Sequence, residues 1–343
     1  MYNVFCLSSY LAFRYVTKEG IPWKEGVIPA FPKVTKKDQK GVVTAEEIIH
    51  FFSHQIKSDE HTGILLSAGI DSAILASFLP EGTKAYTVRF VARDAIDEGP
   101  GASIFATRMN LKHKIVDVTW NDYLSNMDLL MKRKKSPLHA IEVALYKTAM
   151  AARQDEVNRL IVGNGADSTF GGMDKLLSKD WTFEDFMKRY TFVEPSSVLR
   201  DYEDIHGIYL PYKIGDGIDV SAFLKTVHGL GIIQAFNNAI ETAGCSIVAP
   251  YESLFLNAPL DLAKIRNNES KYILRKVFLE RFPDCPIPDK IPFARPMEQW
   301  LANWDGPKRQ EFMDHIDINS FSGDQKWILF CLERFMDLFD KTI

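Results

Sequence analysis

Two aspartates each lie in a turn of small residues that follows a short apolar segment, an arrangement suited to phosphate chemistry. Asp71 lies in Gly63-Ile-Leu-Leu-Ser-Ala-Gly-Ile-Asp-Ser72, and Asp167 in Arg159-Leu-Ile-Val-Gly-Asn-Gly-Ala-Asp-Ser-Thr-Phe-Gly-Gly172. Small residues let backbone N–H groups approach an anion, and the start of a following helix favours negative charge. A carboxylate beside phosphates is explained when a Mg²⁺ lies between them. The two segments therefore predict a site for Mg²⁺-bound phosphates, with Asp71 and Asp167 as metal ligands.

Two common phosphate-binding motifs do not fit these segments. The chain contains no Gly-x-x-x-x-Gly-Lys-Ser/Thr, so it has no Walker loop. Gly163 and Gly165 begin a pattern typical of dinucleotide binding, but Ser168 occupies the position of the third glycine. Because a strand, a glycine turn and a helix occur in many α/β proteins, neither segment identifies a function alone.

The elements that must position these aspartates alternate between strand and helix. Short apolar segments predict strands at 64–66, 85–91, 114–118 and 160–162. Helical patterns lie between or before them, at 45–56, 72–79, 98–110 and 139–153. This alternation predicts an α/β fold with a doubly wound parallel sheet, followed from about residue 180 by a helical C-terminal half. Ligands of such sheets bind outside the carboxyl ends of the strands, where both turns fall.

Several segments together resemble the asparagine synthetase family of the ATP pyrophosphatase (PP-loop) superfamily. The first turn resembles the Ser-Gly-Gly-x-Asp-Ser loop of that superfamily, with Ala68 in place of a glycine. Gly163–Gly172 resembles the family's Gly-Glu-Gly-Ala-Asp-Glu-Leu-Phe-Gly-Gly segment. Lys271-Tyr-Ile-Leu-Arg275 resembles its Lys-x-x-Leu-Arg helix, and Asp289-Lys-Ile-Pro-Phe-Ala-Arg-Pro296 resembles a lysine-bearing loop. In order along the chain, the resemblance spans roughly residues 45 to 305.

The resemblance implies an ATP-dependent ligase of the adenine nucleotide α-hydrolase-like fold, with ATP and Mg²⁺ as cofactors. Such enzymes adenylate a carboxylate, release pyrophosphate and transfer a nitrogen nucleophile to the acyl group. On the matching positions, Lys290 would stabilise charge at the α-phosphate, and Asp71 and Asp167 would hold Mg²⁺. The residues expected to bind ATP are Leu66, Ser67, Gly69, Asp71, Ser72, Val88 and Gly163.

Two departures from the family pattern bear on the nitrogen donor. Asn164 occupies a catalytic position where the family has a glutamate, and an amide cannot act as a base. Residues 1–44 are too short for the family's N-terminal glutaminase. We interpret them as an N-terminal extension, with a remnant of a glutaminase domain as one interpretation, before a synthetase domain at 45–343. The expected partners are a small-molecule or peptide carboxylate and either ammonia, which a separate glutaminase could supply, or an amine.

Two other functions stay open at this stage. Gly69-Ile-Asp-Ser-Ala73 is also close to the loop of NAD synthetase, and the departures at Ala68 and Asn164 would suit a non-catalytic ATP-binding relative. The net charge of −4 argues against a nucleic-acid partner, and no apolar run reaches the ~18 residues of a membrane span. The four cysteines form no Cys-x-x-Cys pair, which suits a cytoplasmic protein. The basic run Lys132–Lys135 is interpreted as solvated surface.

Overall fold

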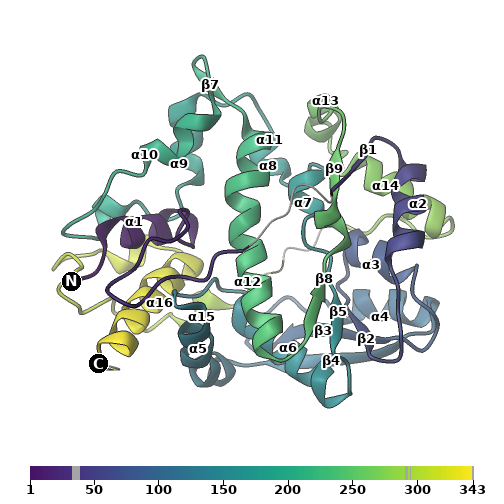
Figure 1. Ribbon diagram of the computed structural model, residues 1–343, viewed down its shortest axis with the longest axis horizontal. Helices are drawn as coiled ribbons and strands as arrows, with labels where there is room; N and C mark the ends of the chain where they lie inside the picture. Colours follow the sequence, from purple (N-terminus) through teal and green to yellow (C-terminus); the bar gives the residue numbers. More distant parts are fainter. Residues whose placement is uncertain (33–38, 290–292, 294, 342–343) are drawn as a thin grey trace.

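A five-stranded parallel sheet organises the fold and lies in the lower right part of the view in Figure 1. The computed structural model describes residues 1–32, 39–289, 293 and 295–341. The strand order is β4-β3-β2-β5-β8. The strands are β2 (Thr62–Leu65), β3 (Lys84–Phe90), β4 (Lys112–Val118), β5 (Arg159–Ile161) and β8 (Ser246–Val248).

The order of the strands reverses between β2 and β5. From β2 the chain adds β3 and then β4 on one side, and it then crosses to the other side to add β5 and β8. Gly63 pairs with Lys84 on β3 and with Leu160 on β5, so β2 lies between both neighbours. In open α/β sheets such a reversal leaves a crevice at the carboxyl ends of the strands. Both glycine-rich turns leave the sheet at this crevice.

Helices cover both faces of the sheet, as Figure 1 shows. Alternate strand residues face opposite cores: Leu160 belongs to one cluster and Ile161 to the other. One face is covered by α2 (Ala45–Gln55), α3 (Ile70–Ala76), α4 (Gly99–Arg108) and α14 (Tyr272–Arg281). The other packs against α5 (Trp120–Lys134), α6 (Glu142–Gln154) and α12 (Gly229–Thr242), with α1 (Val4–Phe13) and α16 (Gly323–Asp340) in the same core.

The remaining elements are short and lie mostly in the helical part of the chain. The helices are α7 (Ala166–Thr169), α8 (Asp174–Leu177), α9 (Phe183–Tyr190), α10 (His206–Tyr209), α11 (Val220–Phe223), α13 (Leu262–Arg266) and α15 (Met297–Trp300). A π-helical segment, Leu224–His228, joins α11 to α12. The 3₁₀ turns are Pro195–Ser197, Leu210–Tyr212, Pro250–Ser253 and Ile318–Ser320. β1 (Lys40–Val42) pairs with β9 (Leu254–Leu256), and β6 (Lys213–Ile214) with β7 (Gly217–Ile218).

The predicted doubly wound sheet and helical C-terminal half are confirmed, but the structure adds elements that the patterns did not indicate. Helix α1 has no apolar period because nine of its ten residues are buried. Strand β8 lies at the edge of the sheet, where its three residues are exposed or half-buried, so it lacks the buried apolar run that marks β5. Within the described part of the chain, no helix has the length and apolar character needed to cross a bilayer.

Candidate active site

The carboxyl ends of β2 and β5 bring the two glycine-rich turns into contact. One turn leaves β2 and enters α3, which carries Asp71; the other leaves β5 and enters α7, which carries Asp167. A Cβ atom on Gly163 would lie 3.4 Å from the Cβ of Asp71 and 3.6 Å from the backbone nitrogen of Ser72. The second turn therefore packs directly on the start of α3, and both aspartates face one cavity.

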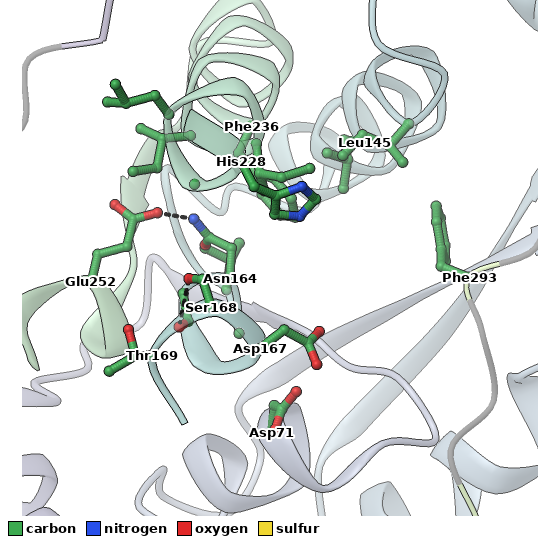
Figure 2. Close-up of a pocket in the computed structure, with 18 of the residues that line it drawn as sticks. Asp71, Leu145, Asn164, Asp167, Ser168, Thr169, His228, Phe236, Glu252 and Phe293 are labelled. Atoms are coloured by element: carbon green, nitrogen blue, oxygen red, sulfur yellow. Dashed lines mark hydrogen bonds between the residues drawn. The ribbon is translucent and has the colours of Figure 1, made fainter. Parts of the chain in front are cut away.

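This cavity has a volume of about 1130 Å³ and two dissimilar walls. The strand-end wall consists of the turns at 66–72 and 163–169. The helical wall consists of α6, the segment Leu224–His228, α12 and the end of α1. Figure 2 shows Asp71 and Asp167 on the first wall, facing His228 on the second. Pockets for one small ligand usually reach 300–1,000 Å³, so the cavity has room for a nucleotide and part of a second substrate.

Lys271 joins the two aspartates. Its Nζ lies 2.5 Å from Oδ2 of Asp71 and 2.9 Å from Oδ1 of Asp167, and its side chain is 8% exposed. Burial alone would lower the pKa of Lys271, but the two carboxylates raise it above its ordinary value, so the ammonium stays charged. Gly172 makes the contact possible, because a Cβ there would overlap both the Asp167 carboxylate and the Lys271 side chain.

The first turn is held by hydrogen bonds between its own residues. The backbone N–H of Ser67 donates to Oγ of Ser72 at 2.9 Å, and the N–H of Gly69 donates to Oγ of Ser67 at 3.2 Å. Ala68 has no positive φ, and its methyl group lies over Gly101, where a Cβ would be 2.6 Å away. Gly101 thus provides the space that the extra methyl group needs.

Most of the residues expected to bind ATP line the cavity. These are Leu66, Ser67, Asp71, Ser72, Val88 and Gly163. Gly69 lies at the N-cap of α3, outside this lining. Lys290 lies outside the described residues. Among the described residues there is no group of three or more His, Cys, Asp or Glu side chains able to hold a metal ion. Asp71 and Asp167 nevertheless fit Mg²⁺, which usually takes one or two carboxylates and completes its shell with phosphate oxygens and waters.

Asn164, on the strand-end wall, contacts a carboxylate from a distant part of the chain. Its Nδ2 donates a hydrogen bond to Oε1 of Glu252, which lies in the 3₁₀ turn after β8 (Figure 2). Burial raises the pKa of Glu252 from 4.5 to about 7. The Oδ1 of Asn164 is buried and has no hydrogen-bond partner among the described residues. An acceptor and a carboxylate that titrates near neutral pH therefore lie side by side in the cavity.

A buried polar network supports the helical wall. Glu142 accepts hydrogen bonds from Nζ of Lys134 and from the backbone N–H of His139, both at 2.6 Å, and its other oxygen accepts from Asn238. The interpretation of Lys132–Lys135 as solvated surface is wrong for Lys134, which is 1% exposed. Packing of α6 against α5 and α12 turns this lysine inward and gives it a carboxylate partner.

Comparison with known proteins then places the chain in a family. A family model described as asparagine synthase matches residues 45–219, just over half of the chain. The chain belongs to the asparagine synthase family. It is therefore a relative of ATP-using enzymes, and this agrees with the resemblance inferred from the two turns. No curated protein sequence matches the chain.

The chain is also similar to solved structures, among them a tRNA thiolase. The U34-tRNA thiolase NcsA from Methanococcus maripaludis, with its [4Fe-4S] cluster, matches 73% of this chain and 83% of its own, with 12% identity and a TM-score of 0.26. A likeness of this strength has no bearing on the activity of this asparagine synthase family member.

The family-matched segment holds both aspartates and Asn164, but Lys271 and Glu252 lie beyond it. Lys271 belongs to a motif noted in the sequence, yet no role followed from that motif because its partner aspartates are distant along the chain. Glu252 carries no local signal, since a single glutamate after a short strand is unremarkable. Only its contact with Asn164 singles it out.

Proposed function

We propose that this asparagine synthase family member is an ATP-dependent ligase that adenylates a carboxylate and forms an amide from it. The observation that supports this most directly is the convergence of Asp71 and Asp167 at the crevice of the sheet, with Lys271 between them. Two carboxylates and an ammonium at that position suit a Mg²⁺-bound pyrophosphate leaving group. A bound Mg²⁺ would neutralise charge on that group.

In the first step, an oxygen of the substrate carboxylate attacks the α-phosphorus of ATP. The bond from that phosphorus to the β-phosphate bridging oxygen breaks, and pyrophosphate leaves with the electron pair. In this proposal Ser67 and Ser72, which line the cavity, donate hydrogen bonds to phosphate oxygens, and Leu66, Val88 and Gly163 of the same lining contact the adenosine. The Lys271 ammonium holds the two aspartates in place as charge moves onto pyrophosphate. Lys290 keeps its proposed role at the α-phosphate.

In the second step, a nitrogen nucleophile attacks the acyl carbon and AMP leaves. The nitrogen becomes positively charged during the attack and must lose a proton. Glu252 can accept that proton because its pKa is near neutral, and the free oxygen of Asn164 can accept a hydrogen bond from the same nitrogen. The glutamate that the family places at position 164 is thus replaced by a glutamate at 252. The nucleophile is ammonia or an amine.

Exchange of labelled pyrophosphate into ATP tests the first step. A panel of carboxylic acids is offered, with aspartate and deamido-NAD included, and ¹⁸O-labelled acid should deliver label to AMP. D71N and D167N should each lower exchange at least a hundredfold, while D305N, a change of a surface aspartate, should not. ATP binding without exchange for any acid would favour a non-catalytic relative, and turnover of deamido-NAD with ammonia would favour the NAD synthetase alternative.

A further inference from the structure

The helical wall carries a cation that has no carboxylate partner among the described residues. Arg14 ends α1 in a left-handed conformation, with φ 68°, and lines the same cavity as Asp71 and Asp167. Its guanidinium carbon lies 4.9 Å from the centre of the Phe192 ring. Its Nε is buried and has no hydrogen-bond partner in the described part of the chain. The guanidinium also has the side chain of Tyr190 as a hydrogen-bond partner, so Nε is the donor that stays unmatched. Leaving a buried donor without a partner is costly, which indicates that a ligand completes it.

His139 presents a second unmatched donor on this wall. Its Nδ1 accepts a hydrogen bond from the backbone N–H of Ile141 at 3.3 Å. Burial holds the pKa of His139 well below its ordinary value, and the charge of Arg14 lowers it further, so the ring is neutral. A neutral ring whose Nδ1 is an acceptor carries its proton on Nε2. That Nε2 is buried and has no partner among the described residues, and His139 as a whole is 7% exposed.

The other histidine of the wall adds no positive charge. His228 bonds through Nδ1 to the hydroxyl of Tyr190 at 2.9 Å, and burial lowers its pKa to about 3. The charge of Arg14 lowers the pKa of His228 further, and the charge of Asp167 raises it. His228 therefore lies close enough to interact with charged groups of both walls. The rest of the helical wall is largely apolar, with Leu145 on α6 and Ile232 and Phe236 on α12 (Figure 2 labels Leu145 and Phe236).

We propose that Arg14 and His139 form an anion-binding subsite for a second carboxylate of the acyl substrate. The substrate class is then a dicarboxylic acid with an apolar spacer. One carboxylate lies at the strand-end wall, where it is adenylated, and the other accepts hydrogen bonds from Nε of Arg14 and Nε2 of His139. The adenylation of the first carboxylate rests on the proposed function, whereas the binding of the second carboxylate at the anion subsite does not. Arg14 lies outside the family-matched residues, so the subsite is a feature of this chain.

Binding is measured first without ATP, so that the result is independent of the chemistry. Straight-chain dicarboxylates from succinate to suberate are compared with monocarboxylates of the same length, by the shift in thermal unfolding midpoint and by calorimetry. Wild-type protein should bind at least one dicarboxylate ten to a hundredfold more tightly than its matched monocarboxylate, as expected for hydrogen bonds to a charged group. Equal affinity for the two series would overturn the proposal.

Two substitutions localise the effect. R14Q should abolish the preference for dicarboxylates, and R14K, which keeps the charge but loses the Nε donor, should retain part of it. R189Q removes an exposed arginine on α9 and should keep the full preference. An intact preference in folded R14Q would also overturn the proposal.

Pyrophosphate exchange then connects the subsite to the substrate. R14Q should raise the KM for the preferred dicarboxylate at least tenfold and change kcat less than threefold, because Arg14 lies away from the reacting phosphate. If a dicarboxylate binds through Arg14 but supports no exchange, the anion subsite stands and the proposed ligase function fails. If exchange is strong with monocarboxylates and R14Q leaves every KM unchanged, the ligase function stands and the subsite assignment fails.

Discussion

The two walls of the cavity balance charge in different ways. On the strand-end wall, the ammonium of Lys271 lies between the carboxylates of Asp71 and Asp167, so opposite charges are neighbours before any ligand binds. On the helical wall, both histidines are neutral, and Arg14 makes no ion pair with a described carboxylate. The difference indicates that the first wall is organised by the protein itself, whereas the second needs an anionic ligand to complete it. Four predictions break or sharpen this comparison.

The largest effect is expected from K271M, which removes the internal charge balance of the strand-end wall. Breaking a buried ion pair leaves uncompensated charge, so the free energy of unfolding should fall by about 3–5 kcal/mol. Mg²⁺ should restore part of the loss, because a divalent cation can replace the ammonium between the two carboxylates. Pyrophosphate exchange should fall at least a hundredfold. Denaturant unfolding with and without Mg²⁺ measures the first two effects.

K276M is the matched control, because Lys276 is an exposed lysine on the same helix. Unchanged stability of K271M would mean that the two aspartates do not depend on Lys271. A loss that Mg²⁺ does not reduce would mean that the cation cannot replace the ammonium between them.

E252Q tests the carboxylate that contacts Asn164 of the strand-end wall. A neutral amide cannot accept a proton, so amide formation should fall about 10²–10⁴-fold while pyrophosphate exchange changes little. In the wild type, Glu252 acts as a base only when it is deprotonated, and its pKa is raised to about 7. Amide formation should therefore rise with pH through about 7 and level off above it, and E252Q should lose this dependence.

Single-turnover rates of amide formation between pH 5.5 and 8.5 measure the effect. E280Q, a change of an exposed glutamate on α14, serves as the control. A wild-type profile that is flat between pH 6 and 8, or an E252Q variant that keeps a rise centred near 7, would assign the proton to another group.

G172A tests how closely the charged groups of the strand-end wall must pack. The added methyl group would overlap the Asp167 carboxylate and Lys271, so one of them must move. A displacement of about 1 Å in such a site can lower the rate roughly a hundredfold, and we expect a loss of that size in pyrophosphate exchange. G207A, where a Cβ meets nothing within 4 Å, should have no effect. Wild-type exchange in G172A would show that the wall tolerates looser packing.

The smallest effect concerns the methyl group of Ala68. G101A should lower the free energy of unfolding by about 1–3 kcal/mol, because its Cβ would lie 2.6 Å from that of Ala68. A68G should by itself cost less than ~1 kcal/mol and should relieve G101A in the double variant. A coupling energy above ~0.5 kcal/mol in urea unfolding would confirm the contact, and additive effects would contradict it.

Much of the fold could be predicted because its signals are local. Apolar strands of three to seven residues, such as β2 and β3, are followed by turns and helices whose order defines a doubly wound sheet. Elements whose residues do not alternate between apolar and polar could not be predicted. A helix that is buried on nearly every side, such as α1, shows no such periodicity. Lys134 shows the same limit for a side chain, because its basic neighbours suggest solvent and only packing gives it Glu142.

The amino-acid sequence by itself determined the two strand–turn–helix segments, the aspartates that they carry and the family to which the chain belongs. The tertiary structure alone decided which groups meet those aspartates. Lys271 lies 200 residues from Asp71, Glu252 lies 88 residues from Asn164, and Arg14 comes from the far end of the chain. The physical reason is that a turn depends on neighbours in the sequence, whereas charge balance and pKa depend on neighbours in space, which only the packing of distant elements provides.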